Sequence, residues 1–205
     1  MHEPVTLVGA GGHAKVVLAA AQAAGVPVAH ILDDDSARWG QRLLETPISG
    51  PTARALTDPA ALVVLAIGDN RRRADLAAAA RCRFATIVHP TAYVHPTVAL
   101  GRGTVLFAGV IVQPDSRLGD HVIVNTGTSI DHDCVIGDFV HLAPGTHLAG
   151  NVIIDEGTFL GIGTSAIPGT HVGAWSVVGA GAAIVRDLPA GCTAVGVPAR
   201  PRRPT

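Results

Sequence analysis

The sequence predicts two folded parts, a small α/β domain of the Rossmann-like type followed by a parallel β-helix. A six-residue repeat that runs from Val88 to about Pro189 indicates the β-helix. Strands that alternate with helices before it indicate the α/β domain. The composition agrees, because 24 glycines suit a fold with many tight corners and 3% aromatic residues suit an aliphatic core. We therefore expect domains over residues 1–86 and 87–190 and a C-terminal tail over 191–205.

The repeat keeps one phase throughout. Stepping by six from Val88 reaches Val, Leu or Ile at every position up to Ile184 except Ala166. The residue four places after each of these is small or β-branched, from Ala92 to Ala182. A period of six fits neither an α-helix nor a simple strand, and is typical of a β-helix whose three hexads close a coil of about 18 residues. The aliphatic residues are expected to stack inside the coil, about 4.8 Å apart, with the small residues near its corners.

Four short strands and two helices are expected before the repeat. Apolar runs predict strands over 5–8, 28–32, 62–67 and 84–88, and helices over 13–24 and 71–81. Gly25 is a natural stop for the first helix. This alternation implies a parallel sheet with right-handed crossovers, in which ligands bind at the carboxyl ends of the strands.

A glycine turn joins the first strand to the first helix. Gly9-x-Gly11-x-x-Ala14 matches a dinucleotide-type fingerprint, and Asp33 follows about 20 residues on. Free N–H groups and the positive end of the helix dipole favour a phosphate at such a turn. Because about four strands are too few for the two halves of a full dinucleotide fold, we prefer a nucleotide diphosphate to NAD. The alternative is a turn that only packs the helix on the sheet.

Three loops meet at the carboxyl ends of these strands, over residues 9–13, 33–35 and 68–71. Arg71, Arg72 and Arg73 open the second helix, and at least one of them could reach a phosphate. The alternative for each of the three arginines is a side chain at the start of the helix that faces solvent and binds no ligand.

One segment of the repeat carries side chains suited to catalysis. His132 lies between Asp131 and Asp133, and a carboxylate beside a histidine fixes its tautomer and raises its basicity. Gly150 follows 18 residues later, one coil above, where its backbone N–H would lie beside the imidazole. His141 is nine residues from His132, half a coil, so the two side chains leave one prism on different sides. They share a site only between subunits, which predicts a trimer with three equivalent grooves.

Net charge, cysteine usage and hydropathy argue against several classes of protein. A formal net charge of -1 does not indicate an electrostatic nucleic-acid binder. Three scattered cysteines argue against a disulfide framework and for a reducing compartment. No apolar run is long enough to span a bilayer, and Glu3-Pro4 leads into a strand rather than a signal peptide. We expect a cytoplasmic protein with no membrane span and no nucleic-acid partner.

These stretches together resemble a known family. The chain is similar to the sugar O-/N-acyltransferases that join a small Rossmann-like domain to a left-handed β-helix. The family includes sialic acid O-acetyltransferases and the bacterial UDP-4-amino-sugar N-acetyltransferases of the bacillosamine and perosamine pathways. The resemblance covers nearly the whole chain and rests on Gly9–Val17, Leu32–Asp34, Ala66–Asn70, Asn125–His141, Leu148–Asn151, Leu160–Gly163 and Val195–Ala199.

The resemblance implies an acetyl-CoA-dependent N-acetyltransferase of a UDP- or GDP-linked amino sugar in bacterial glycan biosynthesis, working as a homotrimer without a metal. His132 would be the general base oriented by Asp133, Asn125 and His141 would contact substrate or thioester, and the Gly150 N–H would hold the oxyanion. The coenzyme would lie between subunits, past Gly150, Ile162, Gly163, Ala180 and Pro198. The nucleotide sugar would be held by Gly11, Gly12, His13, Asp33, Asp34, Gly68, Asn70 and Arg71.

The chain departs from the family at one position and leaves three alternatives open. Members from the bacillosamine pathway carry His-Glu where this chain has His132-Asp133.

An O-acetyltransferase of a sugar such as sialic acid would need the same base and groove, although the glycine loop favours a nucleotide-linked substrate. A zinc hydratase would need three converging histidines, and His141 and His147, six residues apart, lie on neighbouring faces. A non-catalytic trimeric nucleotide-binding protein is the third alternative.

Overall fold

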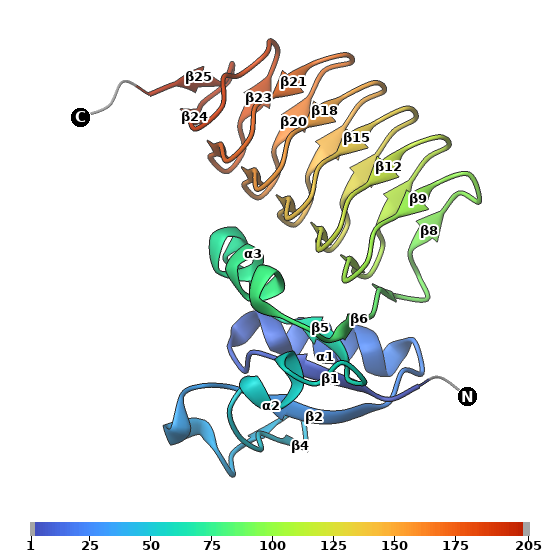
Figure 1. Cartoon of the computed structure of the whole chain (residues 1–205). Coiled ribbons are helices and arrows are strands. Elements are labelled where there is room, and N and C mark those ends of the chain that lie inside the picture. Colours follow the sequence, from blue (N-terminus) through green and yellow to red (C-terminus); the bar gives the residue numbers. More distant parts are fainter. Residues whose placement is uncertain (1–2, 203–205) are drawn as a thin grey trace.

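The computed structural model describes residues 3–202 and contains an α/β domain docked against a long three-sided β-helix (Figure 1). The α/β domain has a parallel sheet in the order β2-β1-β5-β6. Its main strands and helices are β1 (Val5–Val8), α1 (Gly12–Ala23), β2 (Val28–Leu32), β5 (Leu62–Leu65), α3 (Asn70–Ala79) and β6 (Arg83–Phe84). Smaller elements are a 3₁₀ turn (Ser36–Arg38), β3 (Arg42–Leu43), β4 (Thr46–Pro47) and α2 (Ala53–Leu56).

Local sequence explains where the two longer helices begin and end. The α1 helix follows Gly11 directly and stops before Gly25, which has a φ of 68°. Asp69 caps α3, because its side chain accepts a hydrogen bond from the Arg72 N–H at 2.8 Å. Both helices begin one residue earlier than the sequence predicts.

The β-helix has three faces made of parallel two- or three-residue strands. Face 1 consists of β7 (Ile87–Val88), β10 (Val105–Leu106), β13 (Ile123–Val124), β16 (His141–Leu142), β19 (Phe159–Leu160), β22 (Val177–Val178) and β24 (Thr193–Val195). Face 2 consists of β8 (Tyr93–Val94), β11 (Ile111–Val112), β14 (Ser129–Ile130), β17 (His147–Leu148), β20 (Ser165–Ala166) and β23 (Ala183–Ile184). Face 3 consists of β9 (Ala99–Leu100), β12 (Arg117–Leu118), β15 (Val135–Ile136), β18 (Ile153–Ile154) and β21 (His171–Val172).

The aliphatic and small residues that recur every six positions form the core of the β-helix, as the repeat predicts. Leu106, Val124 and Leu142 stack one above another with no exposed surface. Small residues fill the corner positions, and buried hydroxyls there are satisfied: Thr104 donates to the Gly119 carbonyl at 2.8 Å. The fold class predicted from the repeat, an α/β domain followed by a β-helix, is confirmed.

Each corner contains a residue in the left-handed region of backbone conformation. The corner between faces 1 and 2, called the glycine corner, has Gly109, Gly127, Gly145, Gly163 and Gly181 there. The corner between faces 2 and 3, called the histidine corner because His132 lies on it, has Asp115, Asp133, Asn151 and Gly169. The corner between faces 3 and 1, called the aromatic corner, has Gly103, His121, Phe139, Gly157 and Trp175. Asp and Asn tolerate this conformation, whereas bulky residues such as Phe and Trp rarely adopt it.

The α/β domain docks on face 1 and the aromatic corner. Its hydrophobic core continues into the outward side chains of face 1, where Ile87, Val105 and Ile123 are each 1% exposed. The α3 helix lies between the α/β sheet and the β-helix (Figure 1). This docking leaves the histidine corner on the side of the prism away from the α/β domain.

Other predicted boundaries also differ from the structure, and β5 ends at Leu65 rather than at residue 67. The strand expected over 84–88 is two strands, β6 in the α/β sheet and β7 on face 1, because the chain changes layer between them. Within the segment 191–205, β24 extends face 1 and pairs with β25 (Arg200–Pro201), while residues 203–205 lie outside the described part. None of the helices within residues 3–202 is long and apolar enough to cross a membrane.

Candidate active site

His132 and Asp133 form a hydrogen-bonded pair on the histidine corner. The Nδ1 of His132 lies 2.7 Å from Asp133 Oδ2, and about half of each side chain is exposed. Because a carboxylate accepts the Nδ1 hydrogen, the neutral imidazole carries its lone pair on Nε2. The hydrogen bond that His132 donates to Asp133 raises the pKa of His132, and the charge of Asp131 raises it further. The pair is therefore arranged as a base with a fixed tautomer, and the short Asp side chain reaches far enough.

Gly150 lies directly against the imidazole of His132. A Cβ built on Gly150 would lie 2.6 Å from both Cε1 and Nε2 of His132, closer than real Cβ contacts. The carbonyl of His132 accepts the Asn151 N–H at 2.9 Å, whereas the backbone hydrogen bonds within residues 3–202 leave the Gly150 N–H unused. Glycine at this position leaves room for the ring, and its N–H is not engaged by a backbone carbonyl of the described residues.

A cavity of about 430 Å³ lies at the carboxyl ends of β1, β2 and β5. It is lined by the glycine turn together with His13, Asp33, Gly68 and two cationic side chains. The α1 helix begins here with no side-chain cap and no acidic residue in its first turn, so its N–H groups can receive an anion. Asp33 braces the turn by accepting the Ala10 N–H at 2.7 Å.

The cationic side chains in this cavity are Arg38 and Arg72. Arg38 Nη1 donates to the Ala10 carbonyl at 2.8 Å, and Arg38 Nε pairs with Asp35 at 3.2 Å. Arg71, the arginine selected from the sequence, instead places its guanidinium 3.6 Å from the ring centre of Trp175. Sequence reasoning missed Arg38; its only signal was a basic residue soon after Asp33.

Two further predicted ligands of the nucleotide sugar use their side chains elsewhere. The Asp34 carboxylate accepts from the Thr52 N–H and hydroxyl, both at 2.9 Å. The Asn70 amide donates to the carbonyls of Gly157 at 3.0 Å and Thr158 at 3.2 Å. Both side chains therefore hold the protein's own backbone in this structure.

Asn125, His141 and His13 form a row between face 1 and the nucleotide cavity. His141 Nδ1 lies 3.2 Å from the Gly68 carbonyl, and its Nε2 lies 3.4 Å from Asn125 Nδ2. Burial lowers the pKa of His141 to about 4, and the nearby His13 and Arg73 lower this pKa further. Burial also lowers the pKa of His13 to about 4, with a further contribution from Arg73. Both rings are neutral at pH 7, and Nε2 of His13 is buried without a protein partner among the described residues.

The residues predicted to contact the coenzyme lie on two corners and in the turn between β24 and β25. Ile162, Gly163 and Ala180 belong to the glycine corner, where Ile162 is 62% exposed. Gly150 belongs to the histidine corner, on the other side of face 2. Pro198 is exposed in the turn between β24 and β25.

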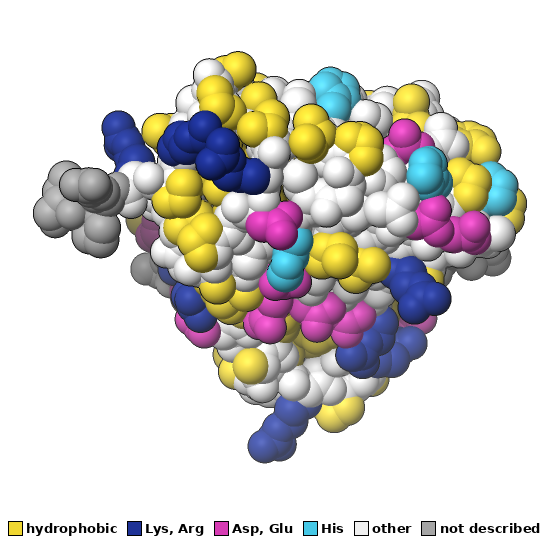
Figure 2. Space-filling model, turned by 90° about the horizontal axis from the view of Figure 1, so that it is seen from above, with side chains coloured by type: hydrophobic (Ala, Val, Ile, Leu, Met, Phe, Trp, Pro, Cys, Tyr) yellow, Lys and Arg dark blue, Asp and Glu magenta, His cyan; other side chains and the backbone are white. Residues whose placement is uncertain are grey.

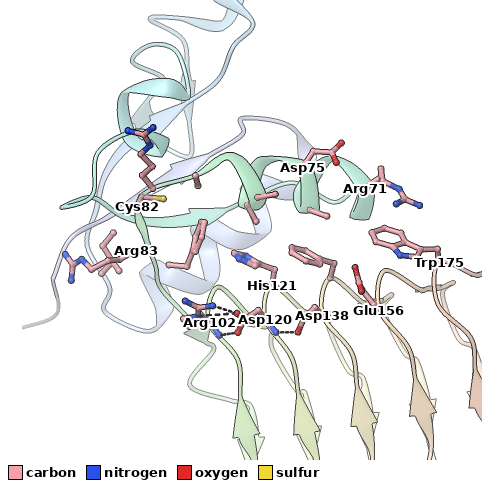
Figure 3. Close-up of a pocket in the computed structure, with 18 residues that line it drawn as sticks. Arg71, Asp75, Cys82, Arg83, Arg102, Asp120, His121, Asp138, Glu156 and Trp175 are labelled. Carbon is pink, nitrogen blue, oxygen red and sulfur yellow. Dashed lines mark hydrogen bonds and ion pairs between the residues drawn. The ribbon is translucent and has the colours of Figure 1, made fainter.

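A second cavity, of about 920 Å³, lies between α3 and the aromatic corner (Figure 3). Carboxylates of Asp120, Asp138 and Glu156 line the β-helix side, and Arg102 pairs with Asp120 at 2.7 Å. Of the predicted site residues, this cavity contains Arg71 alone among residues 3–202. No group of three or more His, Cys, Asp or Glu side chains in that same part of the chain is placed to hold a metal ion.

Comparisons with known proteins identify the family and agree with the fold. Residues 4–80 match the model of the PglD N-terminal domain. PerB from Caulobacter crescentus, solved with CoA and GDP-perosamine, is 42% identical with a TM-score of 0.90, over 98% of both chains. The acetyltransferase domain of PglB from Neisseria gonorrhoeae, solved with acetyl coenzyme A, is 38% identical with a TM-score of 0.90, over 98% of this chain and all of that one.

A curated relative is the UDP-N-acetylbacillosamine N-acetyltransferase of Bacillus subtilis, 40% identical over 110 residues. The aligned part spans 51% of this chain and 51% of that relative. The fold, the histidine–carboxylate pair and these similarities define a β-helix acyltransferase. The chain belongs to the family of sugar O-/N-acyltransferases that join a small Rossmann-like domain to a left-handed β-helix.

Proposed function

We propose that the protein transfers the acetyl group of acetyl-CoA directly to the amino group of a UDP- or GDP-linked amino sugar. The observation that carries this proposal is the His132–Asp133 pair, with Nδ1 and Oδ2 2.7 Å apart and Nε2 beside Gly150. A second support is the cavity at the glycine turn, which has the donors and cations that a diphosphate requires. The relatives contribute the chemistry of the substrates, since their structures hold CoA with GDP-perosamine or acetyl coenzyme A.

In the proposed reaction, the amine nitrogen of the sugar attacks the thioester carbonyl carbon. His132 Nε2 takes a proton from that amine, and the imidazolium formed is stabilised by the Asp133 carboxylate. The Gly150 N–H donates to the developing oxyanion. The C–S bond then breaks, and His132 returns the proton to the departing sulfur, so that an amide and free coenzyme A thiol are formed.

We propose that each active site lies between two subunits of a homotrimer. Within one chain, the nucleotide cavity lies on the face 1 side, while His132 lies on the corner between faces 2 and 3. A neighbouring copy can bring its histidine corner up to the glycine corner, Asn125 and the nucleotide cavity of the first, which also unites the predicted coenzyme contacts. Exposed apolar side chains suit this contact, since Tyr93 and Ile111 on face 2 and Val135 and Ile153 on face 3 are each at least 40% exposed.

The surface of the β-helix supports such a contact between copies. Figure 2 shows hydrophobic side chains in rows across the surface seen from above, interrupted by histidines and carboxylates. On face 2, the side chains of Ser129 and His147 in the same chain are joined by a hydrogen bond of 2.8 Å. In this proposal Ile162, Gly163 and Ala180 line the coenzyme groove, and Pro198 lies near the adenine end.

The proposal is tested by thiol release from acetyl-CoA against a panel of UDP-, GDP- and dTDP-linked amino sugars and free sialic acid. We expect release with one of the nucleotide-linked amino sugars and amide formation on its amino group. Faster release with sialic acid would establish the O-acetyltransferase alternative. Absence of release with every acceptor, while nucleotides bind, would contradict an acetyltransferase of these sugars.

A further inference from the structure

We propose that Arg73, together with Asn70, is a positioning residue that sets the nucleotide-binding loop, residues 67–70, at a fixed place on the β-helix. This inference rests on the proposed function, because it assumes that the cavity beside that loop binds the nucleotide. Arg73 is 1% exposed, although arginine is seldom fully buried without a carboxylate partner. Every hydrogen bond recorded for its guanidinium goes to a neutral oxygen.

On the β-helix side, α3 binds one carbonyl from each of three successive coils. Arg73 donates from Nε to the His121 carbonyl at 3.0 Å and from Nη2 to the Phe139 carbonyl at 2.8 Å. Asn70 donates to the Gly157 carbonyl at 3.0 Å. These three acceptors occupy the same position of the aromatic corner, 18 residues apart in sequence.

The backbone conformation of the corner explains why these carbonyls are available. His121, Phe139 and Gly157 have φ values of 56°, 58° and 67°. Their N–H groups bond to the coil below, but none of their carbonyls accepts a backbone N–H within residues 3–202. The aromatic corner therefore presents a regular row of free acceptors, which side-chain donors from α3 can satisfy.

On the other side, the same guanidinium holds the loop that lines the nucleotide cavity. Arg73 Nη1 donates to the Ile67 carbonyl at 2.9 Å, and Nη2 donates to Asn70 Oδ1 at 2.9 Å. Ile67 and Gly68 both line the cavity, and the Gly68 carbonyl also receives His141 Nδ1 at 3.2 Å. Because one guanidinium bonds both sides, a shift of Arg73 relative to the aromatic corner would also shift the loop.

The geometry requires arginine rather than any cation. Its planar guanidinium carries five N–H donors in a fixed fork, whereas the lysine ammonium has three donors around one point. Burial lowers the pKa of Arg73 only to about 10, so the side chain remains charged at neutral pH. Arg73→Lys keeps the charge but cannot reach both the loop and two coils at once.

The test is the binding of UDP and GDP to Arg73→Lys by calorimetry, together with steady-state kinetics. We expect nucleotide affinity to fall on the order of tenfold, because a small misplacement of a binding loop has a large effect. The KM for the nucleotide sugar should rise by a similar factor, with the KM for acetyl-CoA unchanged. The matched control is Arg102→Met, which removes an ion pair near the same corner but outside the nucleotide cavity and should leave both KM values as they are.

Hydrogen exchange distinguishes positioning from a general loss of stability. In Arg73→Lys the amides of residues 67–70 should exchange faster, while those of the coils at His121 and Phe139 keep their protection. Unchanged nucleotide affinity with unchanged exchange in the loop would overturn the proposal, as would an equal rise of both KM values. If the wild type binds neither nucleotide, the proposed function fails, whereas the exchange pattern still decides whether Arg73 fixes the loop. If Arg73→Lys does not fold, Asn70→Ala, which removes the bonds to one coil and the bond that Asn70 accepts from Arg73, is examined by the same exchange measurement.

Discussion

Gly150 and His132 occupy equivalent positions of consecutive coils. A Cβ on Gly150 would lie only 2.6 Å from the Cε1 and Nε2 atoms of the His132 imidazole. The contact places the proposed base against a backbone position that has no side chain. It also makes the position of the ring depend on the absence of a single methyl group. The close approach is specific to Gly150 on this corner, because a Cβ on Gly169, also on the histidine corner, would meet no atom within 4 Å.

The substitution Gly150→Ala should therefore reduce turnover more than stability. The added methyl group must displace the exposed ring of His132, and a misplaced base loses on the order of 10²-fold in rate. Because the ring can move into solvent, the melting temperature should change little. Steady-state kinetics and thermal unfolding of the same preparation measure both quantities, and a variant with wild-type kcat would show that the contact has no part in catalysis.

Asp133→Asn should change the pH profile in a defined direction. The carboxylate raises the pKa of His132, so the amide variant should have a lower pKa. Activity requires the unprotonated base and rises with pH, so the acidic limb of kcat/KM should move to lower pH in the variant. The rate on the plateau should fall, because the tautomer is less firmly held and the base is weaker. An acidic limb that stays in place would show that a group other than His132 controls it.

Arg72→Ala should weaken nucleotide binding more than Arg71→Ala does. Arg72 lines the cavity at the glycine turn, whereas Arg71 lies on the Trp175 ring. Loss of one hydrogen bond to a charged phosphate corresponds to about tenfold or more in affinity. Calorimetry with UDP and GDP on both variants measures the difference. The reverse order would place the diphosphate beside Trp175 instead.

Stability should fall as the pH is lowered from 7 to 5. His13, His121 and His141 each have a pKa lowered to about 4, with burial as the largest cause. The unfolded chain binds protons near pH 6.5 and the folded chain does not, so each histidine destabilises the fold below pH 6.5. The effect is on the order of 1–2 kcal/mol per histidine at pH 5. Thermal unfolding at both pH values checks this, and in His121→Gln the pH dependence should be smaller; an undiminished slope would mean that His121 is not buried neutral.

The β-helix could be predicted because each hexad constrains residue type on its own. An aliphatic residue such as Leu142 must face inward, and a small residue such as Thr128 must fit a corner, so periodicity alone reveals both. The pairing of His132 with Asp133 and its contact with Gly150 followed from adjacency and from the 18-residue coil. These contacts are local in the repeat, which is why the sequence indicates them.

The docking of the α/β domain could not be predicted in the same way. Whether Asn70 faces a ligand or the Gly157 carbonyl depends on where α3 lies against the aromatic corner. The same placement buries Arg73, directs Arg71 to Trp175 and leaves Arg72 in the cavity. Three consecutive arginines are alike in sequence, and only the contact between the two domains gives them different environments.

The most direct test of the proposed mechanism is the rate of thiol release by His132→Ala with acetyl-CoA and the best nucleotide-linked acceptor. Removing a general base should lower kcat by about 10²–10⁴-fold. The variant should keep the wild-type affinity for UDP or GDP and the wild-type subunit number by light scattering, since the glycine turn and its neighbouring loops, not His132, line the nucleotide cavity. Turnover within a few-fold of the wild type would contradict the assignment of His132 as the base.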